Sequence, residues 1–205
     1  SRGLTGEIAA RYGIGYAPEA WQGLEPAFQN YNDPSLAECG LVIVNEQGRR
    51  YDRFRDRIMF PIQDQKGNVI GFGGRVLGAG EPKYLNSPET PLFEKGRELY
   101  GLTQARKAIH ELDTVIVVEG YMDVVGLAQL GIENAVAALG TATTGMHVQK
   151  LLRLASRIVF CFDRDSAGDR AAWRAVENSL EHLVDNKRID ILQLDSDQDP
   201  DEYVR

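Results

Sequence analysis

The sequence predicts an α/β protein in two parts: a mixed α+β first half, and a second half built on a mostly parallel four-stranded sheet. Residues 113–205 alternate short β-branched runs with amphipathic segments of helical period, which is typical of βαβ units. Residues 1–112 contain a hairpin signal, two helix signals and a long stretch rich in glycine and proline. We therefore expect two subdomains, 1–112 and 113–205.

Two short stretches of the first half carry helix signals. "LTGEIAARY" at residues 4–12 has the composition of a helix, and "DPSLAEC" at residues 33–39 contains a helix start. In the second stretch Asp33 suits the N-cap position, and Pro34 suits the first helical position, where its missing N–H is not needed. We expect a short helix at each place.

A hairpin follows in the first half. "RIMFPIQD" (57–64) and "NVIGFGGRVL" (68–77) are rich in β-branched and aromatic residues and are joined by a turn that contains glycine. Residues 78–102 show neither the strand period nor the helix period, yet they are too apolar for a disordered linker. We expect them to form an ordered loop with short elements.

The second half alternates strands and helices. The predicted strands are 114–118, 133–139, 157–162 and 188–194, and the predicted helices between them are 121–131, 144–155 and 167–185. Right-handed crossovers then place helices on both faces of the sheet. On the buried face of the last helix we expect Ala172, Val176, Leu180 and Leu183.

Acidic side chains follow three of these four strands. They are Glu119, then Asp163 and Asp165, and finally Asp195, Asp197, Asp199 and Asp201. Because the carboxyl ends of parallel strands meet at one edge of the sheet, we expect these carboxylates to converge. Clustered carboxylates repel one another unless a cation neutralises them, and hard oxygen ligands select Mg²⁺. The pattern therefore predicts a metal site at this edge.

Each acidic group also has a simpler interpretation when it is taken alone. Asp165 or Ser166 is suited to cap the following helix, and Glu119 before Gly120 is suited to a turn. The acidic run near the end of the sequence is typical of a solvated segment. Three such groups at the strand ends of one sheet favour the metal site.

Composition sets limits on the class of protein. Lys+Arg and Asp+Glu balance in residues 1–112, so the whole net charge of −7 lies in residues 113–205. No apolar run approaches the ~20 residues of a membrane span, and no segment has the pattern of a signal peptide. With two cysteines far apart and three scattered histidines, the sequence predicts a reduced, cytoplasmic protein and excludes a zinc finger within these residues.

Several motifs carry a family resemblance. "VVEGYMDVV" and, 44 residues later, "FDRDSAG" resemble the Toprim domain of bacterial primases, topoisomerases and some nucleases. "RDRIMFPI", "GFGGRVL", "PKYLNSPETPLFEKGRELYGL" and "DPDEYVR" are similar to the RNA polymerase core of bacterial DnaG-type primases. The resemblance runs from Arg2 to Arg205. It implies a Rossmann-like Toprim subdomain packed against the first subdomain, with a groove between them.

The resemblance implies that the protein synthesises short RNA primers on single-stranded DNA from ribonucleoside triphosphates. It also implies that this takes place during replication in the bacterial nucleoid and that the product is an RNA–DNA hybrid. Paired Mg²⁺ ions, for which Mn²⁺ can substitute, assist this chemistry. The resemblance also implies that the catalytic residues are Glu119, Asp163 and Asp165. The metal ligands are Glu119, Asp163, Asp165 and Asp199, with Asp123 and Asp201 as supporting candidates. Glu119 is expected to act as a ligand or as a general base.

The basic residues implied for nucleotide or template binding are Arg75, Lys83, Lys95 and Arg2. Phosphate contacts from such residues give a salt-dependent affinity with little sequence preference. Such a site recognises mainly the charge of phosphate groups. We therefore also expect that a highly phosphorylated guanine nucleotide, such as a stringent-response alarmone, competes with the substrate for this site.

Two other functions stay open at this point. One is a different Toprim phosphotransfer enzyme, such as a nuclease or a topoisomerase fragment. The other is a nucleotide-binding or DNA-binding module without activity. We also expect that the sequence is a fragment, because the family's zinc-binding domain, helicase-binding domain and a further helical segment of its core lie outside these residues. The replicative helicase would then bind through a part that is absent here.

Overall fold

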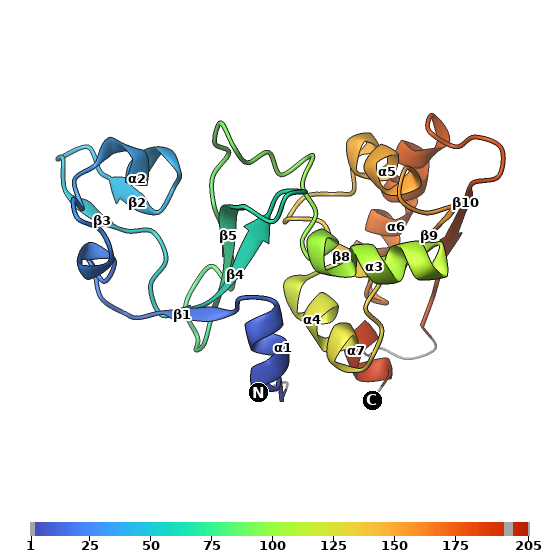
Figure 1. Ribbon diagram of the computed structural model, residues 1–205, viewed down its shortest axis with the longest axis horizontal. Helices are drawn as coiled ribbons and strands as arrows, with labels where there is room; N and C mark the ends of the chain where they lie inside the picture. Colours follow the sequence, from blue (N-terminus) through green and yellow to red (C-terminus); the bar gives the residue numbers. More distant parts are fainter. Residues whose placement is uncertain (1–2, 195–198, 205) are drawn as a thin grey trace.

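The first part of the molecule is built around an antiparallel sheet. The computed structural model describes residues 3–194 and 199–204. The sheet has the order β1-β4-β5-β6, with an outlying two-stranded sheet β2-β3. The elements are α1 (Gly6–Arg11), β1 (Gly15–Ala17), η1 (Glu25–Ala27), α2 (Pro34–Glu38), β2 (Val42–Val44), β3 (Arg50–Asp52), β4 (Arg57–Gln63), β5 (Val69–Val76) and β6 (Tyr84–Asn86). Figure 1 shows β2, β3 and α2 at one end of the molecule, away from the second part.

The predicted hairpin and both predicted helices of this part are confirmed. β4 pairs with β5 in antiparallel register, and the Asp33 side chain accepts a hydrogen bond from the Ser35 N–H at the start of α2. In the hairpin turn the Asp64 side chain accepts hydrogen bonds from two backbone N–H groups, and Gly67 takes a φ of +88° that favours glycine. The strands β1, β2 and β3, of three residues each, were not predicted.

The second part contains the predicted parallel sheet. The strand order is β10-β9-β7-β8, and all three pairings are parallel. The elements are α3 (Leu102–Leu112), β7 (Thr114–Val118), α4 (Tyr121–Gln129), β8 (Ala135–Ala137), α5 (Gly145–Leu152), β9 (Arg157–Phe160), α6 (Ser166–Leu180), β10 (Arg188–Ile191) and α7 (Pro200–Tyr203). The four predicted strands and the three helices between them are thus confirmed.

Apolar clusters cover both faces of the parallel sheet. Successive residues of β7 alternate between the faces, so Val115 and Val117 belong to one cluster and Val118 to the other. The first cluster is completed by α3, α5 and α6, and the second by α4 together with α1 and β4 of the first part. The first part of the chain therefore packs against the α4 side of the sheet.

Helix α3 was missed from the sequence. Its residues Leu102, Ala105 and Ile109 are buried with the helical spacing i, i+3 and i+7. Gly101 precedes it with a φ of +78°, and a Cβ there would lie 2.7 Å from Val124 of α4. The signal was present as this apolar spacing, although polar and charged residues separate its members.

The buried face predicted for α6 was wrong in part. Ala172 is buried as expected, but Leu180 is 64% exposed and Leu183 is 43% exposed. The helix ends at Leu180, so the later residue cannot share its face. The helix instead buries small residues, including Ala175 and Ser179, against the sheet. No helix within the described ranges is both long and apolar enough to cross a membrane.

An aromatic seam joins the two parts of the molecule. Tyr121, the first residue of α4, stacks on Phe60 of β4 with ring centroids 5.1 Å apart, and it meets the edge of Tyr100 at 4.7 Å. The ring lies directly over the backbone of Gly73 in β5, where a Cβ would come within 2.3 Å of it. Tyr100 also exchanges two backbone hydrogen bonds with Ala137 of β8. The seam therefore fixes the antiparallel sheet against the parallel one.

A buried histidine ties the loop around Lys95 to α5. The Thr144 N–H donates to Nδ1 of His147 at 3.2 Å, and Nε2 lies 3.0 Å from the carbonyl oxygen of Lys95. A neutral ring with its proton on Nε2 satisfies both contacts. Burial lowers the pKa of His147 to about 4, despite carbonyl oxygens that favour the charged form.

We expect His147 to make the stability of the fold pH-dependent. Its pKa is lower in the folded state than the ordinary value of 6.5, so its contribution is present above pH 6.5 and is lost as the pH falls to about 4. The loss should be about 2–3 kcal/mol. Urea unfolding between pH 7.5 and 4 should therefore show a shallower pH dependence for His147→Gln than for wild type, with the exposed His110→Gln as the control. Equal slopes in wild type and His147→Gln would contradict the assignment.

Candidate active site

Two of the predicted site residues meet at the carboxyl edge of the parallel sheet. Glu119 follows β7, Asp163 follows β9, and the Asp163 N–H donates a hydrogen bond to Oε1 of Glu119 at 3.1 Å. Burial, followed by the nearby charge of Asp163, raises the pKa of Glu119, and the hydrogen bond opposes this rise. The two residues, 44 positions apart in the sequence, thus lie side by side and line the same cavity.

Gly168 makes this close approach possible. It lies in the first turn of α6, and a Cβ there would lie 2.0 Å from the carbonyl oxygen of Asp163 and 2.9 Å from Oε1 of Glu119. The strand end and the helix can therefore pack together only around a residue without a side chain.

Asp165 is the N-cap of α6. Its Oδ1 accepts hydrogen bonds from the N–H groups of Ala167 at 2.8 Å and Gly168 at 2.7 Å. This is the capping arrangement that the sequence left open as the simpler alternative. A role as metal ligand would add to this structural role.

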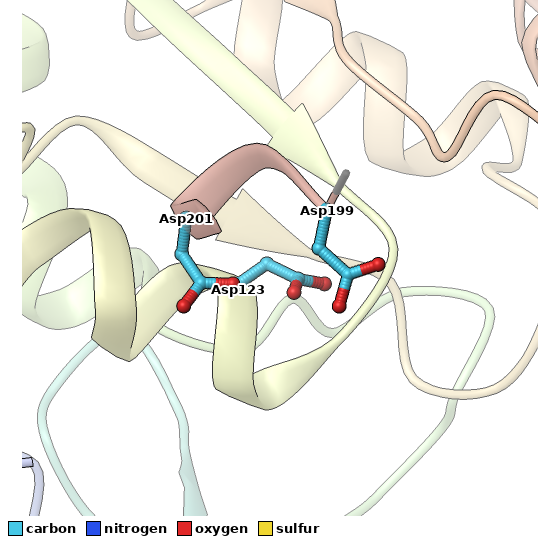
Figure 2. A group of neighbouring side chains, drawn as sticks. All are labelled: Asp123, Asp199 and Asp201. Atoms are coloured by element: carbon cyan, nitrogen blue, oxygen red, sulfur yellow. The ribbon is translucent and has the colours of Figure 1, made fainter. Parts of the chain in front are cut away.

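A second group of carboxylates lies beside the first. Asp123 of α4, Asp199 before α7 and Asp201 within α7 place one oxygen atom each within 4.8 Å of one another. Figure 2 shows the three side chains converging from α4, from α7 and from the residue that precedes α7. Asp123 and Asp201 are buried. This set of hard oxygen donors is compatible with binding of a divalent metal ion.

The two helices that carry this group are held by local contacts. The Gly120 N–H donates to Oδ2 of Asp123 at 2.9 Å, which closes the first turn of α4. Helix α7 packs on α4 at Gly126, where a Cβ would lie 2.6 Å from Cβ of Asp201. The position of Asp201 therefore depends on a glycine one turn along α4.

A cavity of about 340 Å³ joins both carboxylate groups to the first part of the chain. Its acidic lining residues are Glu119, Asp123, Asp163 and Asp199. The opposite wall comes from β6, with Lys83 immediately before the strand and Tyr84 and Asn86 within it. The cavity thus lies between the two parts, where the family resemblance implied a groove.

The four predicted basic residues occupy different places. Lys83 lines this cavity, and its Nζ lies 6.0 Å from the ring of Tyr84. Arg75 is paired with Tyr84 across the sheet, and its guanidinium lies 5.9 Å from the same ring. Among the described residues that line the cavity, neither Arg75 nor Lys95 is present. Arg2 lies outside the described residues.

Two uncharged residues of the cavity were not singled out for the site from the sequence. The Tyr121 hydroxyl donates to Oδ1 of Asn86 at 2.7 Å, and Nδ2 of Asn86 donates to the carbonyl oxygen of Leu139 at 3.0 Å. Asn86 therefore connects β6 to α4 and to the loop after β8. Its signal was only its place in the stretch "PKYLNSPET", because an amide between two strands has no distinctive pattern.

Comparison with known families agrees with this arrangement. Residues 1–106 match the family model of the DNA primase catalytic core, N-terminal domain, and residues 116–204 match a Toprim-like model. The chain belongs to the DNA primase catalytic core family. The Toprim match contains every carboxylate of the two groups described above.

Individual primases and primase cores are similar over the whole chain. A DNA primase of Neisseria meningitidis is 59% identical over 204 residues, which cover 100% of this chain and 34% of that protein. The crystal structure of a DNA primase domain from Pseudomonas aeruginosa has a TM-score of 0.93 at 55% identity, covering 98% of this chain and 64% of that one. The structure of a DnaG primase catalytic domain bound to ssDNA has a TM-score of 0.91 at 51% identity, with coverage of 99% and 66%. The chain thus spans about a third of the length of the curated relative it matches.

We expect Gly168→Ala to destabilise the protein. Alanine favours a helix over glycine, so any loss must come from the contact with the carbonyl oxygen of Asp163. Such overpacking costs about 1–3 kcal/mol of unfolding free energy, measurable by urea unfolding. The matched control is Gly6→Ala in α1, where an added Cβ meets nothing within 4 Å and stability should be unchanged or higher. A Gly168→Ala variant as stable as wild type would contradict the packing described here.

Proposed function

We propose that this chain is the catalytic core of a primase that synthesises short RNA primers on single-stranded DNA by Mg²⁺-dependent nucleotidyl transfer. The observation that carries this proposal is the cavity in which Glu119, Asp163 and the Asp123 group face Lys83 across the seam between the two parts. Its acidic wall is suited to metal ions, and Lys83 on the opposite wall is suited to a triphosphate. The family membership adds the substrate class.

The carboxylates have distinct proposed roles. Glu119, Asp163, Asp165 and Asp199 would hold Mg²⁺, or Mn²⁺ in its place, with Asp123 and Asp201 in support. Bound metal ions supply charge neutralisation for the attacking and leaving oxygens. The 3′-hydroxyl of one nucleotide attacks the α-phosphorus of the next, a phosphodiester bond forms and pyrophosphate leaves. The raised pKa of Glu119 also suits a general base that accepts the hydroxyl proton.

The basic residues have proposed roles in binding. Lys83 would contact the triphosphate, while Arg75, Lys95 and Arg2 would contact template phosphates along the seam. One structural relative is described as bound to ssDNA, which supports a template of this class. An RNA–DNA hybrid would occupy the same surface after synthesis, and the replicative helicase would bind another part of the full-length protein. We place the boundary of the two subdomains at residues 112 and 113.

The cations near the acidic cavity also suit an inhibitor. A highly phosphorylated guanine nucleotide, such as an alarmone, would present phosphate charge to Lys83 and to bound metal. It would therefore compete with the elongating nucleotide. The competition should weaken in Lys83→Ala.

Two other functions are tested by the same reaction. Incubation with single-stranded template, Mg²⁺ and labelled ribonucleotides yields extended RNA if the chain is a primase core. Cleaved DNA would favour a nuclease, and binding without a product would favour a silent binding module. The family membership favours the first outcome.

We expect Asp163→Asn to lower primer synthesis by at least about 100-fold, because one charge of the metal site is lost. Asp165→Asn should do the same while keeping α6 intact, since asparagine is as good an N-cap as aspartate. Without metal, Asp163→Asn should melt at a higher temperature than wild type, because a repulsion with Glu119 is removed. The matched control is Asp169→Asn, which removes a charge from the first turn of α6. Unchanged Mn²⁺ affinity in both site variants, measured by calorimetry, would refute the assignment.

Lys83→Ala should weaken binding of nucleotide or of single-stranded DNA without altering metal affinity. If Lys83 contacts a DNA phosphate, the slope of log affinity against log salt should fall by about 0.7, the single-strand value per contact. The same test applies to Lys95→Ala. The exposed Lys107→Ala of α3 is the control. A loss confined to nucleotide affinity would place Lys83 at the triphosphate alone, and unchanged affinity for both ligands would exclude it from binding.

A further inference from the structure

A second cavity lies on the other side of Glu119. It has a volume of about 370 Å³ and shares Glu119, Ala138 and Gly140 with the acidic cavity. Its remaining walls are the loop of residues 140–143 after β8 and the first half of α6. The two cavities are therefore neighbours at the carboxyl edge of the parallel sheet.

The charges of the two cavities differ in sign. Four carboxylates and one lysine line the acidic cavity, whereas Arg170, Arg174 and a single carboxylate, Glu119, line the second one. Arg170 and Arg174 are one turn apart on α6, and both are exposed. Neither forms an ion pair with a described residue. Two guanidinium groups that form no ion pair with a described residue thus line the same cavity.

The loop wall adds hydrogen-bond donors without partners. Thr143 lines the cavity and is 3% exposed, yet its hydroxyl oxygen has no hydrogen-bond partner in the structure. A buried hydroxyl left in this state costs about 1–3 kcal/mol, so a rotation of the side chain that brings the hydroxyl to a ligand in the cavity regains that free energy. Within the described chain, the backbone N–H groups of residues 140–143 also donate to no protein acceptor.

These donors are held in place. Nδ2 of Asn86 donates to the carbonyl oxygen of Leu139 at 3.0 Å, and Nδ2 of Asn178 in α6 donates to that of Thr143 at 2.7 Å. The Thr144 hydroxyl donates to the carbonyl oxygen of Gly96 at 2.6 Å and, as N-cap, accepts from the His147 N–H. The loop is fixed at both ends, so it presents its donors without a large entropic cost.

We propose that this second cavity is a polyphosphate-binding subsite. Guanidinium groups in pairs, a hydroxyl and backbone N–H groups are the donors that bind phosphate oxygens in proteins. The volume is at the lower end of the range for small-ligand pockets and accommodates pyrophosphate or the phosphate chain of a nucleotide. The assignment of an anion site depends only on these donors.

The source of the polyphosphate rests on the proposed primer synthesis. Making the first bond of a primer requires two nucleotides at once, one to supply the 3′-hydroxyl and one to supply the α-phosphorus. The reaction also releases pyrophosphate. A cationic cavity that adjoins the metal-binding one across Glu119 is suited to the phosphates of the second nucleotide or to the departing pyrophosphate.

Titration calorimetry of the chain with sodium pyrophosphate, in buffer that contains EDTA, tests the site directly. Without metal the acidic cavity repels the probe, and comparison with the double arginine variant separates binding in the second cavity from binding at other cations. Arg170→Ala with Arg174→Ala should raise the Kd at least about tenfold. Thr143→Val should raise it about threefold without lowering the melting temperature, because the hydroxyl has no bond to lose in the free protein. Arg49→Ala, in the distant β2–β3 turn, should bind as wild type.

Absence of pyrophosphate binding by wild type, or equal Kd values for wild type and the double arginine variant, would overturn the proposal. Loss of single-stranded DNA binding with pyrophosphate binding retained would also overturn it and would make these arginines a nucleic-acid surface. This titration tests the anion site independently of primer synthesis. If the chain makes no primers, the proposed function is refuted, but the anion site is not.

Two reaction assays then separate the sources. A double variant that loses dinucleotide formation from two ribonucleotides, but extends a preformed primer normally, would identify the phosphates of the initiating nucleotide. A double variant that loses primer extension and the pyrophosphate-driven reverse reaction to the same degree would identify the cavity as a site for the departing pyrophosphate. Unchanged rates in both assays would exclude the cavity from the reaction.

Discussion

The contact between Tyr121 and the bare backbone of Gly73 determines how the two parts of the molecule meet. Any side chain at position 73 would push the antiparallel sheet away from α4. Tyr121 comes two residues after Glu119, and its hydroxyl holds Asn86 on the facing strand. The same ring thus fills the seam and sets the separation of the acidic wall from Lys83. Chemistry that needs both walls therefore depends on this contact, together with the stacking of Tyr121 on Phe60 and the backbone hydrogen bonds between Tyr100 and Ala137.

The crowding of carboxylates on the acidic side of the cavity lowers the free energy of unfolding. Asp123 and Asp201 are buried close together, and Glu119 has a raised pKa because burial and Asp163 both disfavour its charge. Glycines at the closest approaches, Gly126 beside Asp201 and Gly168 beside Glu119, leave room for this crowding. Sites that hold like charges in place for catalysis commonly sacrifice folding free energy in this way. The apolar clusters on both faces of the sheet supply the compensating stability.

The parallel sheet was predictable because each strand is a short β-branched run between helical segments. From that topology the meeting of Glu119 with Asp163 followed directly. Asp123 and Asp201 were expected only as supporting candidates, because their close approach depends on a four-residue helix that packs at Gly126, far away in sequence. The strands β1, β2 and β3 were not predicted, and α3 was missed although its apolar spacing was present. The exposed Leu180 shows that apolar spacing alone does not define the buried face of a helix.

Glu119 lines both cavities. Its charge therefore couples the binding of a cation in the acidic cavity to the binding of an anion in the second cavity. A cation that neutralises Glu119 from the acidic side removes the repulsion that an anion meets on the arginine side. By reciprocity, an anion held there raises the affinity for the cation by the same factor. The two ligands would therefore bind cooperatively without any movement of the chain. Metal loading and polyphosphate occupancy become one coupled equilibrium, with a single carboxylate as the element that couples them.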